Sequence, residues 1–171
     1  KKHHKVVGIG YEREVLTMAK NNCKNFNVNV SLIQGDMRTL PFKSNSFDVV
    51  LSLGTIEHVP ETIRAIKEHI RVLKKGSLLL ISVPNKTSLV YLAKLAQMCL
   101  KIWPLGYEKS FSKKLFKYLL ERNGARVLNF YSTELSVGTR LPIAGRLIKL
   151  LDKPLVLLGI GGHFLYFLAR K

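Results

Sequence analysis

The feature that most constrains this chain is a regular alternation of short apolar runs with segments of helical periodicity. Runs rich in Val, Ile and Leu predict strands, and apolar residues spaced three and four apart predict helices. The predicted strands are 5–9, 27–34, 47–53, 77–83, 125–131 and 162–168. The predicted helices are 12–22, 61–74, 88–103, 112–122 and 141–153. This alternation predicts an α/β fold, with a mostly parallel sheet and helices on both of its faces.

Local signals refine some of these elements. Ser112 and Gly124 should delimit the helix 112–122, and Gly76 should stop the helix 61–74. The side chains expected on the inner face of the helix 12–22 are Val15, Leu16 and Ala19.

Length and charge narrow the class of protein. The chain has 171 residues and a formal net charge of +17, which indicates one domain with a strongly cationic surface. Residues 1–84 carry thirteen basic and seven acidic side chains, whereas residues 85–171 carry fifteen and four. This balance favours an anionic membrane surface, a nucleic acid or an acidic substrate as partner. Cys23 and Cys99 are too few for a disulfide framework, so a reduced, cytoplasmic setting is expected.

No segment reads as a membrane span or as a targeting peptide. The apolar stretches around 88–103 and 155–169 are interrupted by polar residues or glycines, and both fall short of the roughly 20 apolar residues that cross a bilayer. No transmembrane helix is therefore predicted.

The most specific pattern lies between Gln34 and Pro60, QGDMRTLPFKSNSFDVVLSLGTIEHVP. A strand ending in Gly-Asp, a Leu-Pro-Phe loop, a second strand and then Glu-His resemble the class I S-adenosylmethionine-dependent methyltransferases, in particular the small-molecule branch with the ubiquinone and sterol methyltransferases. The similarity continues through residues 72–85, 107–131 and 164–171. It implies a Rossmann-like sheet with an antiparallel last strand, S-adenosyl-L-methionine as the cofactor and methyl transfer as the activity.

The resemblance also implies which residues hold the cofactor. Asp36 would accept hydrogen bonds from the adenine amino group, and Met37 would lie against the adenine ring through its sulfur. Asp36 also fits a simpler role as a turn residue after Gly35. The segment that would pass under the methionine part of the cofactor comprises Ser52, Leu53 and Gly54.

The N-terminal end departs from the family pattern. The family's first strand, glycine-rich loop and first helix should precede the strand 5–9, yet only KKHH comes before it. The fold is therefore expected to be N-terminally incomplete. The slot for an acidic, ribose-binding residue holds Gly10, and Glu12 is the candidate substitute. Glu12 is equally suited to stabilise a helix N-terminus.

A rival alignment makes Gly8-Ile9-Gly10 a degenerate glycine loop. Asp36, 26 residues after Gly10, would then bind the ribose. This alignment lacks a third glycine, because Arg13 stands in its place, and it puts the Gln34–Pro60 pattern one strand out of step.

His58 is the candidate catalytic residue. A histidine at this position can remove a proton from an acceptor hydroxyl as the methyl group transfers. The plainer reading is a helix-start histidine that bonds to the backbone. The other histidines show no ligand spacing with acidic residues or cysteines, so no metal is predicted.

Two segments, 86–110 and 137–160, are expected to be helical covers within a single methyltransferase-like domain, 1–171. Each has a narrow cationic stripe beside a wide apolar surface: Lys94, Gln97 and Lys101 in the first, and Arg146, Lys149 and Lys153 in the second. They should form an apolar lid over a hydrophobic or lipid-linked substrate and touch an anionic membrane surface. Plain core packing with a solvated stripe is the alternative.

Two functions remain open from the sequence. The first is methyl transfer from S-adenosyl-L-methionine to a small or lipid-like acceptor, impaired by the missing glycine loop. The second is a non-catalytic, methyltransferase-like module that binds a partner, either a membrane surface or RNA. RNA is the less favoured partner, because the aromatic residues form no recognisable stacking platform.

Overall fold

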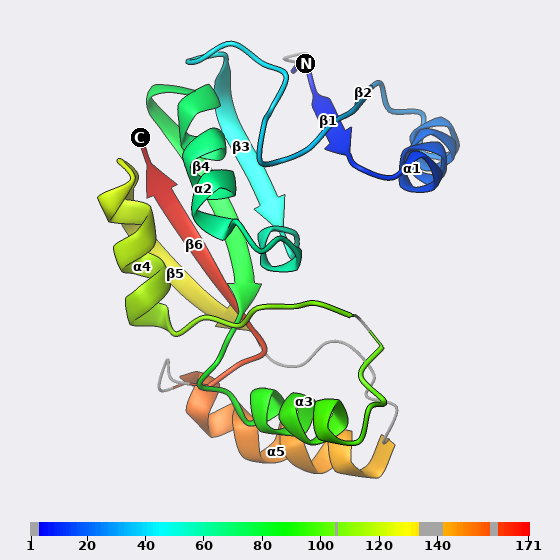
Figure 1. Cartoon of the computed structure of the whole chain (residues 1–171), viewed down its shortest axis with the longest axis vertical. Helices are drawn as coiled ribbons and strands as arrows, with labels where there is room; N and C mark the ends of the chain where they lie inside the picture. The colour runs from blue at the N-terminus through cyan, green and yellow to red at the C-terminus, as the bar shows by residue number, and fades with distance from the viewer. Residues whose placement is uncertain (1–3, 105, 134–141, 158–160) are drawn as a thin grey trace.

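The computed structural model describes residues 4–104, 106–133, 142–157 and 161–171 (Figure 1). Its strands are β1 (Val7–Gly10), β2 (Ser31–Gln34), β3 (Phe47–Leu53), β4 (Leu73–Pro84), β5 (Arg126–Thr133) and β6 (Phe164–Arg170). Its helices are α1 (Arg13–Asn25), the short 3-10 helix η1 (Ile56–His58), α2 (Thr62–Val72), α3 (Leu89–Cys99), α4 (Lys113–Arg122) and α5 (Pro142–Leu157).

The strands form two sheets. β1 and β2 pair in parallel, and β3, β4, β6 and β5 form a second sheet in that order. β3 runs parallel to β4, with Leu51 opposite Leu80, whereas β6 runs antiparallel to both of its neighbours. β5 therefore points the same way as β3 and β4, and β6 alone is reversed. The predicted α/β fold with an antiparallel last strand is confirmed.

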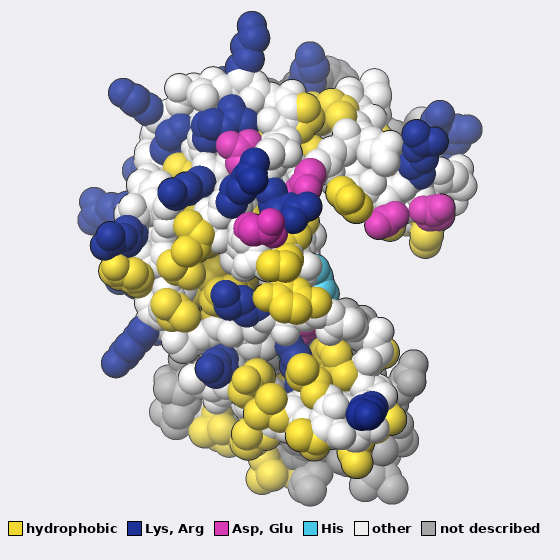
Figure 2. Space-filling model, in the orientation of Figure 1, with side chains coloured by type: hydrophobic (Ala, Val, Ile, Leu, Met, Phe, Trp, Pro, Cys, Tyr) yellow, Lys and Arg dark blue, Asp and Glu magenta, His cyan; other side chains and the backbone are white. Residues whose placement is uncertain are grey.

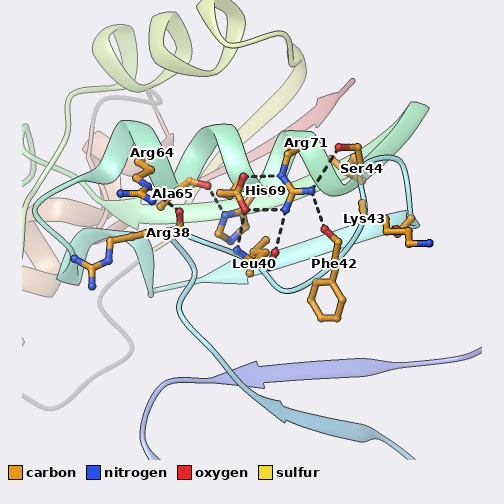
Figure 3. Close-up of polar contacts among 12 residues, drawn as sticks. Arg38, Leu40, Phe42, Lys43, Ser44, Arg64, Ala65, His69 and Arg71 are labelled. Atoms are coloured by element: carbon orange, nitrogen blue, oxygen red, sulfur yellow. Dashed lines mark hydrogen bonds and ion pairs between the residues drawn. The ribbon is translucent and has the colours of Figure 1, made fainter.

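The direction in which successive strands are added to the sheets reverses between β1 and β3. The crossover β1–α1–β2 leads away from β3, and the crossover β3–α2–β4 leads away from β1 (Figures 1 and 3). In open parallel sheets, ligands bind beside such a switch point, at the carboxyl ends of the strands. Here β1 and β3 do not pair with each other. The facing edges of these two strands therefore have no pairing strand among the described residues.

The core lies between the four-stranded sheet and the helices α2 and α4, which cover one of its faces (Figure 1). The rings of Phe111 and Phe116 meet with centroids 5.2 Å apart, and Phe116 meets Phe167 at 5.1 Å. Other fully buried members of this core are Ile66, Leu79, Ile81, Leu120 and Ala169.

The opposite face of the same sheet is apolar and exposed. Its exposed side chains include Val49, Leu51, Leu53, Leu128 and Tyr131. Strand residues alternate between faces, so these residues are the outward half of the pattern that buries Val50 and Ser52 on the inner side. Among the described residues, α2 and α4 cover only the inner face of this sheet, and α1 packs against β1 and β2 instead.

The unit β1–α1–β2 contains no fully buried residue. The predicted inner face of α1 is wrong as a buried surface, because Val15 is exposed while Leu16 and Ala19 are only half-buried. A two-stranded sheet has too little apolar surface to bury a helix face completely.

Four helix ends differ from their predictions: α1 continues to Asn25 and α5 to Leu157, beyond the predicted 22 and 153, whereas α2 and α3 end early. α2 ends at Val72, because Leu73 pairs with Phe47 and opens strand β4. Gly76 lies inside β4 with φ +78°, so it bends a strand rather than ending a helix. α3 ends at Cys99, before the predicted 103. The predicted start of α4 is confirmed, since the Ser112 hydroxyl accepts from the Leu115 N–H at 3.3 Å.

The two segments expected as covers place α3 and α5 together beyond the carboxyl end of β4 (Figure 1). Residues 137–141 and 158–160 of the second segment lie outside the described residues. So do the side chains of Arg146 and Lys149 in α5.

Candidate functional site

The predicted site residues fall into two groups on either side of the switch point. Gly10 ends β1 and Glu12 follows it, and Asp36 and Met37 follow β2. The second group, Ser52 to Gly54, closes β3. All of them lie at or just beyond carboxyl ends of parallel strands, as expected for a ligand site in this class of fold.

At the end of β1, Gly10 accepts a hydrogen bond from the Gly35 N–H at 3.0 Å and so ties the two loops together. A Cβ atom at Gly10 would lie 3.0 Å from the Leu16 side chain, which leaves little room for a larger residue. Glu12 stands at the N-cap of α1, is exposed, and makes no side-chain capping bond. Its carboxylate is therefore available, and a ribose-binding role stays a prediction.

Asp36 lies in an ordered ion pair. Its Oδ1 accepts from the Arg38 backbone N–H at 2.7 Å, and its carboxylate receives the Arg38 guanidinium at 2.6–3.0 Å. Arg38 also contacts Glu61 at 2.9 Å. The hydrogen bonds from Arg38 hold the pKa of Asp36 below its usual value, so the carboxylate is an acceptor at neutral pH. The turn role is confirmed, while adenine binding stays a prediction.

Met37 is half-buried and packs against the main core. Its side chain therefore has a structural contact that is independent of any bound ring. Contact with adenine also stays a prediction.

The loop that follows Asp36 is clamped to α2 (Figure 3). Arg71 donates to the carbonyl oxygens of Leu40 and Phe42, at 3.0 and 2.7 Å, and pairs with Glu68 at 2.6 Å. Glu68 in turn accepts from the Leu40 N–H at 2.8 Å. A guanidinium can make several such bonds at once because its donors lie in one rigid plane. The clamp fixes the path from Asp36 to β3.

The end of β3 turns sharply at Gly54. This residue has φ +62°, a conformation that glycine adopts without strain, and its N–H donates to the Ser82 hydroxyl at 3.0 Å. Ser52 is buried and its hydroxyl lies 2.6 Å from that of Thr55. Leu53 is 48% exposed, so its side chain offers an uncovered apolar surface at the strand end.

Glu57 is the residue at this site that sequence reasoning missed. Its side chain is 1% exposed, and Oε2 has no hydrogen-bond partner among the described residues. A buried carboxyl loses the hydration that stabilises its charge, and this raises the pKa of Glu57 to about 7. The Glu-His pair led to a prediction for the histidine, although a carboxyl four residues after the end of β3 was the available signal for Glu57.

His58 is 40% exposed, and its Nδ1 lies 3.0 Å from the Tyr107 carbonyl oxygen. A carbonyl oxygen only accepts, so Nδ1 carries the proton and donates. In the neutral ring Nε2 is then free to accept a proton. Nε2 lies 4.0 Å from Glu57 Oε1, beyond hydrogen-bonding distance. The interpretation that His58 bonds to the backbone is confirmed, and its catalytic role stays a prediction.

A buried polar cluster lies between this strand end and the cover helices. Lys94 Nζ contacts Glu108 Oε1 at 2.6 Å, and both side chains are almost fully buried. Lys94 also lies 5.3 Å from the centre of the Trp103 ring. The predicted solvated stripe on α3 is therefore wrong for Lys94, because its charge is neutralised by an acidic partner fourteen residues further on. Burial lowers the pKa of the neighbouring His163, which favours a neutral ring.

The described residues contain no cluster of three or more His, Cys, Asp or Glu side chains suited to hold a metal ion. Within the same part of the chain, no helix is both long and apolar enough to cross a bilayer.

Comparisons with known proteins agree with this geometry. Residues 1–81 match the family model described as a methyltransferase domain. Demethylmenaquinone methyltransferase of Staphylococcus haemolyticus is 29% identical over 116 residues, which are 68% of this chain and 48% of that protein. The Staphylococcus aureus protein of the same name is 30% identical over 113 residues, 66% of this chain and 46% of that protein. The matched residues thus span about half the length of these relatives.

Solved structures show the same fold. An S-adenosylmethionine-dependent methyltransferase of Methanosarcina mazei has a TM-score of 0.69 at 19% identity, with 98% of this chain and 82% of that one covered. One from Mesorhizobium loti has a TM-score of 0.67 at 16% identity, covering 98% and 80%. The cyclase SpnF has a TM-score of 0.66 at 19% identity, covering 98% and 66%. The fold is that of the class I S-adenosylmethionine-dependent methyltransferases, a scaffold that also supports other chemistry.

These matches imply S-adenosylmethionine as the cofactor. The described residues fit part of this cofactor. Asp36 and the exposed Glu12 supply hydrogen-bond acceptors, and the turn at Gly54 lets a ligand approach the backbone closely. Among the described residues, no strand pairs between β1 and β3, and no glycine-rich turn leads from such a strand into a helix.

Proposed function

We propose that this chain is the main part of a methyltransferase domain that transfers a methyl group from S-adenosylmethionine to a small, lipid-like acceptor. The observation that carries the proposal is the switch point between β1 and β3, where the family-model match and the candidate residues coincide. The staphylococcal relatives are named for a methyl acceptor with a lipid-like chain, demethylmenaquinone, and this supports the acceptor class.

We also propose that one further strand, followed by a glycine-rich turn and a helix, completes the domain. Three observations support this. β1 and β3 both present unpaired edges at the switch point, the outer face of the four-stranded sheet is apolar and bare, and the chain spans about half of its relatives. An unpaired edge beside an apolar face is unfavourable in water. A further strand of the same polypeptide would pair with the edges, and a further helix would cover the apolar face.

The chemistry requires a dry, ordered pocket more than a reactive side chain. S-adenosylmethionine supplies an electrophilic methyl group when it is bound. For a hydroxyl acceptor, the oxygen would gain the methyl carbon as the bond between that carbon and the cofactor's sulfur breaks, which leaves S-adenosylhomocysteine, and the hydroxyl proton would pass to a base. Among the described residues, Glu57, with its unpartnered Oε2, and His58, through Nε2, are suited to take that proton.

Calorimetric titration with S-adenosylhomocysteine tests the proposal. The chain is titrated alone and with an N-terminal extension taken from the Staphylococcus aureus relative, covering the residues that precede its match to this chain. We expect at least about tenfold tighter binding with the extension, since it adds backbone donors for the cofactor's carboxylate. No binding by either form would refute the cofactor assignment.

A matched pair of variants tests the site itself. Asp36→Asn should weaken binding in the extended form, because it removes an ionised acceptor at the switch point. Asp48→Asn is the control: this carboxylate is 79% exposed at the opposite end of β3 and pairs with Lys74. Equal effects of the two changes would show that Asp36 has no special role.

A non-catalytic binding module is the second candidate. The observation that favours it is the open switch point, since the described residues leave the cofactor site incomplete. Under this alternative the extended chain would fold yet show no heat with S-adenosylhomocysteine and no transfer of radioactive methyl to lipid extracts.

A further inference from the structure

Helix α3 exposes apolar side chains and buries a charged one, which is the reverse of an ordinary surface helix. Its exposed side includes Leu92 at 60%, Leu95 at 39% and Met98 at 47% exposure, whereas its lysine, Lys94, is only 5% exposed. Surface helices normally bury their apolar stripe and solvate their charges. Here the ion pair with Glu108 fixes the opposite orientation, so the apolar stripe must face outward.

Helix α5 repeats this arrangement in its described part. Leu150, Leu151 and Leu157 are 70%, 54% and 82% exposed, while Asp152 is 1% exposed and accepts from the Gly162 N–H at 2.9 Å. The loop after α3 extends the apolar surface with Leu100 and Ile102. We call the exposed apolar residues of α3, α5 and this loop the apolar cap (Figure 2).

The charges around the apolar cap have one sign. Glu108 and Asp152, the acidic side chains of the described residues in 86–110 and 142–157, are both buried. The exposed ionised side chains of this region are cationic: Lys86, Lys101, Lys109 and Lys153. Lys101 lies in the same loop as Leu100 and Ile102, and Lys153 lies on α5; we call these two the lysine rim. Exposed leucines together with such cations are the composition of segments that lie in the interface of an anionic bilayer.

We propose that the apolar cap is a membrane-binding surface whose occupant is an anionic lipid bilayer. Exposed apolar surface of this extent marks an interaction site, and the lysine rim selects negative headgroups. A second copy of this chain fits less well, because two rims of the same sign would repel. The cap also lies at the opposite end of the molecule from the N-terminus (Figure 1), so a segment entering at the switch point would meet a different surface.

Membrane binding does not depend on methyl transfer, so its test is separate from that of the proposed function. The 171-residue chain is sedimented with vesicles of phosphatidylcholine alone and of phosphatidylcholine with phosphatidylglycerol. We expect binding to the anionic vesicles and at least about tenfold weaker partitioning at high salt, because the lysine rim is screened. Equal binding to both vesicle types, or none, would overturn the proposal.

Variants of matched exposure locate the surface. Leu92→Ser with Leu95→Ser, and separately Lys101→Glu with Lys153→Glu, should each weaken partitioning at least about tenfold. The controls on α4 are Leu115→Ser with Tyr118→Ser, and Lys114→Glu with Lys117→Glu, all at exposed positions. Losses as large from the α4 changes would overturn the assignment to the cap.

A fluorescent probe in an otherwise unaltered cap gives a readout that does not depend on whether the surface variants fold. Cys99 is exposed at the end of α3, so it is labelled with an environment-sensitive dye in a Cys23→Ser background. A blue shift on adding anionic vesicles supports insertion. An unshifted spectrum, or sedimentation velocity showing a dimer that the Leu92 and Leu95 changes dissociate, overturns the proposal.

Discussion

The four-stranded sheet and the unit β1–α1–β2 differ sharply in packing. The sheet, with α2 and α4, buries a continuous core from Ile56 to Ala169, whereas the smaller unit contains no fully buried residue. Each contains two parallel strands joined by a helix, β3–α2–β4 in the sheet and β1–α1–β2 in the smaller unit, so local pattern does not explain the difference. The four-stranded sheet offers α2 and α4 a wide apolar face, whereas two strands offer α1 too little apolar surface to bury its inner side.

The unit β1–α1–β2 thus has regular strands and a regular helix although it buries no residue fully. The unit is held to the rest of the chain by the loop clamp at Arg71 and by the Arg38–Glu61 contact. Its position flanks the proposed cofactor site, so the site has one rigid side and one side of low local stability.

The largest expected effect separates the two regions directly. Phe167→Ala removes a fully buried ring from the main core and should lower the free energy of unfolding by about 4 kcal/mol. Leu16→Ala, in the half-buried face of α1, should change it by less than about 1 kcal/mol. Urea denaturation followed by circular dichroism measures both. Similar losses for the two changes would remove the distinction between the regions.

The next effect comes from the buried ion pair. Lys94→Met leaves Glu108 charged and unpaired in the interior, at a cost of about 3 kcal/mol. Adding Glu108→Leu should recover most of that loss, since no charge then remains buried. Lys101→Met, at an exposed position, serves as the control and should change the melting temperature little. Failure of the double variant to recover would contradict a simple ion-pair account.

Glu57 predicts a pH dependence of stability. Its pKa rises from the usual 4.5 to about 7 in the folded chain, so the folded state binds more protons than the unfolded state between these values. The free energy of unfolding therefore falls as pH rises from about 4.5 to 7. Glu57→Gln should remove this slope and stabilise the chain by up to about 3 kcal/mol above pH 7. Parallel slopes for the two proteins would be the contrary result.

The smallest effect couples the two regions. Arg71→Gln breaks the bonds to Leu40 and Phe42 and should cost about 1–2 kcal/mol. Hydrogen exchange should speed up in β1 and β2 more than in β4, because the clamp orders the loop between the regions. Arg64→Gln, which removes a single bond to the Arg38 carbonyl, is the milder control. Uniform acceleration over all strands would argue against a local clamp.

Several parts of the fold and site were predictable from local sequence. The Ser112 cap and the apolar runs in β3 and β4 depend on interactions within a few residues, and these predictions are confirmed. The family resemblance predicted the reversal of β6, and the structure confirms it. Gly54 was predicted at the site, and the structure places it at a turn with positive φ. The residues Gly10, Glu12 and Asp36 do lie at strand ends, although their contacts with a cofactor stay predictions.

The features that local sequence did not predict depend on residues that are distant in the chain. Lys94 was predicted to be solvated from its helical spacing, but Glu108 is placed beside it only by the loop that follows α3. Glu57 carries no local sign of burial, and Arg71 carries none of its bonds to a loop about thirty residues earlier. Burial and long-range pairing are properties of the assembled chain, so spacing alone could not predict them.

The sequence by itself determined the order of strands and helices and the residues at the strand ends, because periodicity, caps and turn residues act locally; the reversed last strand followed from the family resemblance. Only the tertiary structure decided that the sheet divides between β1 and β3, and that α3 turns its leucines outward and its lysine inward. Both outcomes follow from contacts between residues far apart in the chain, where the burial of one surface leaves another exposed.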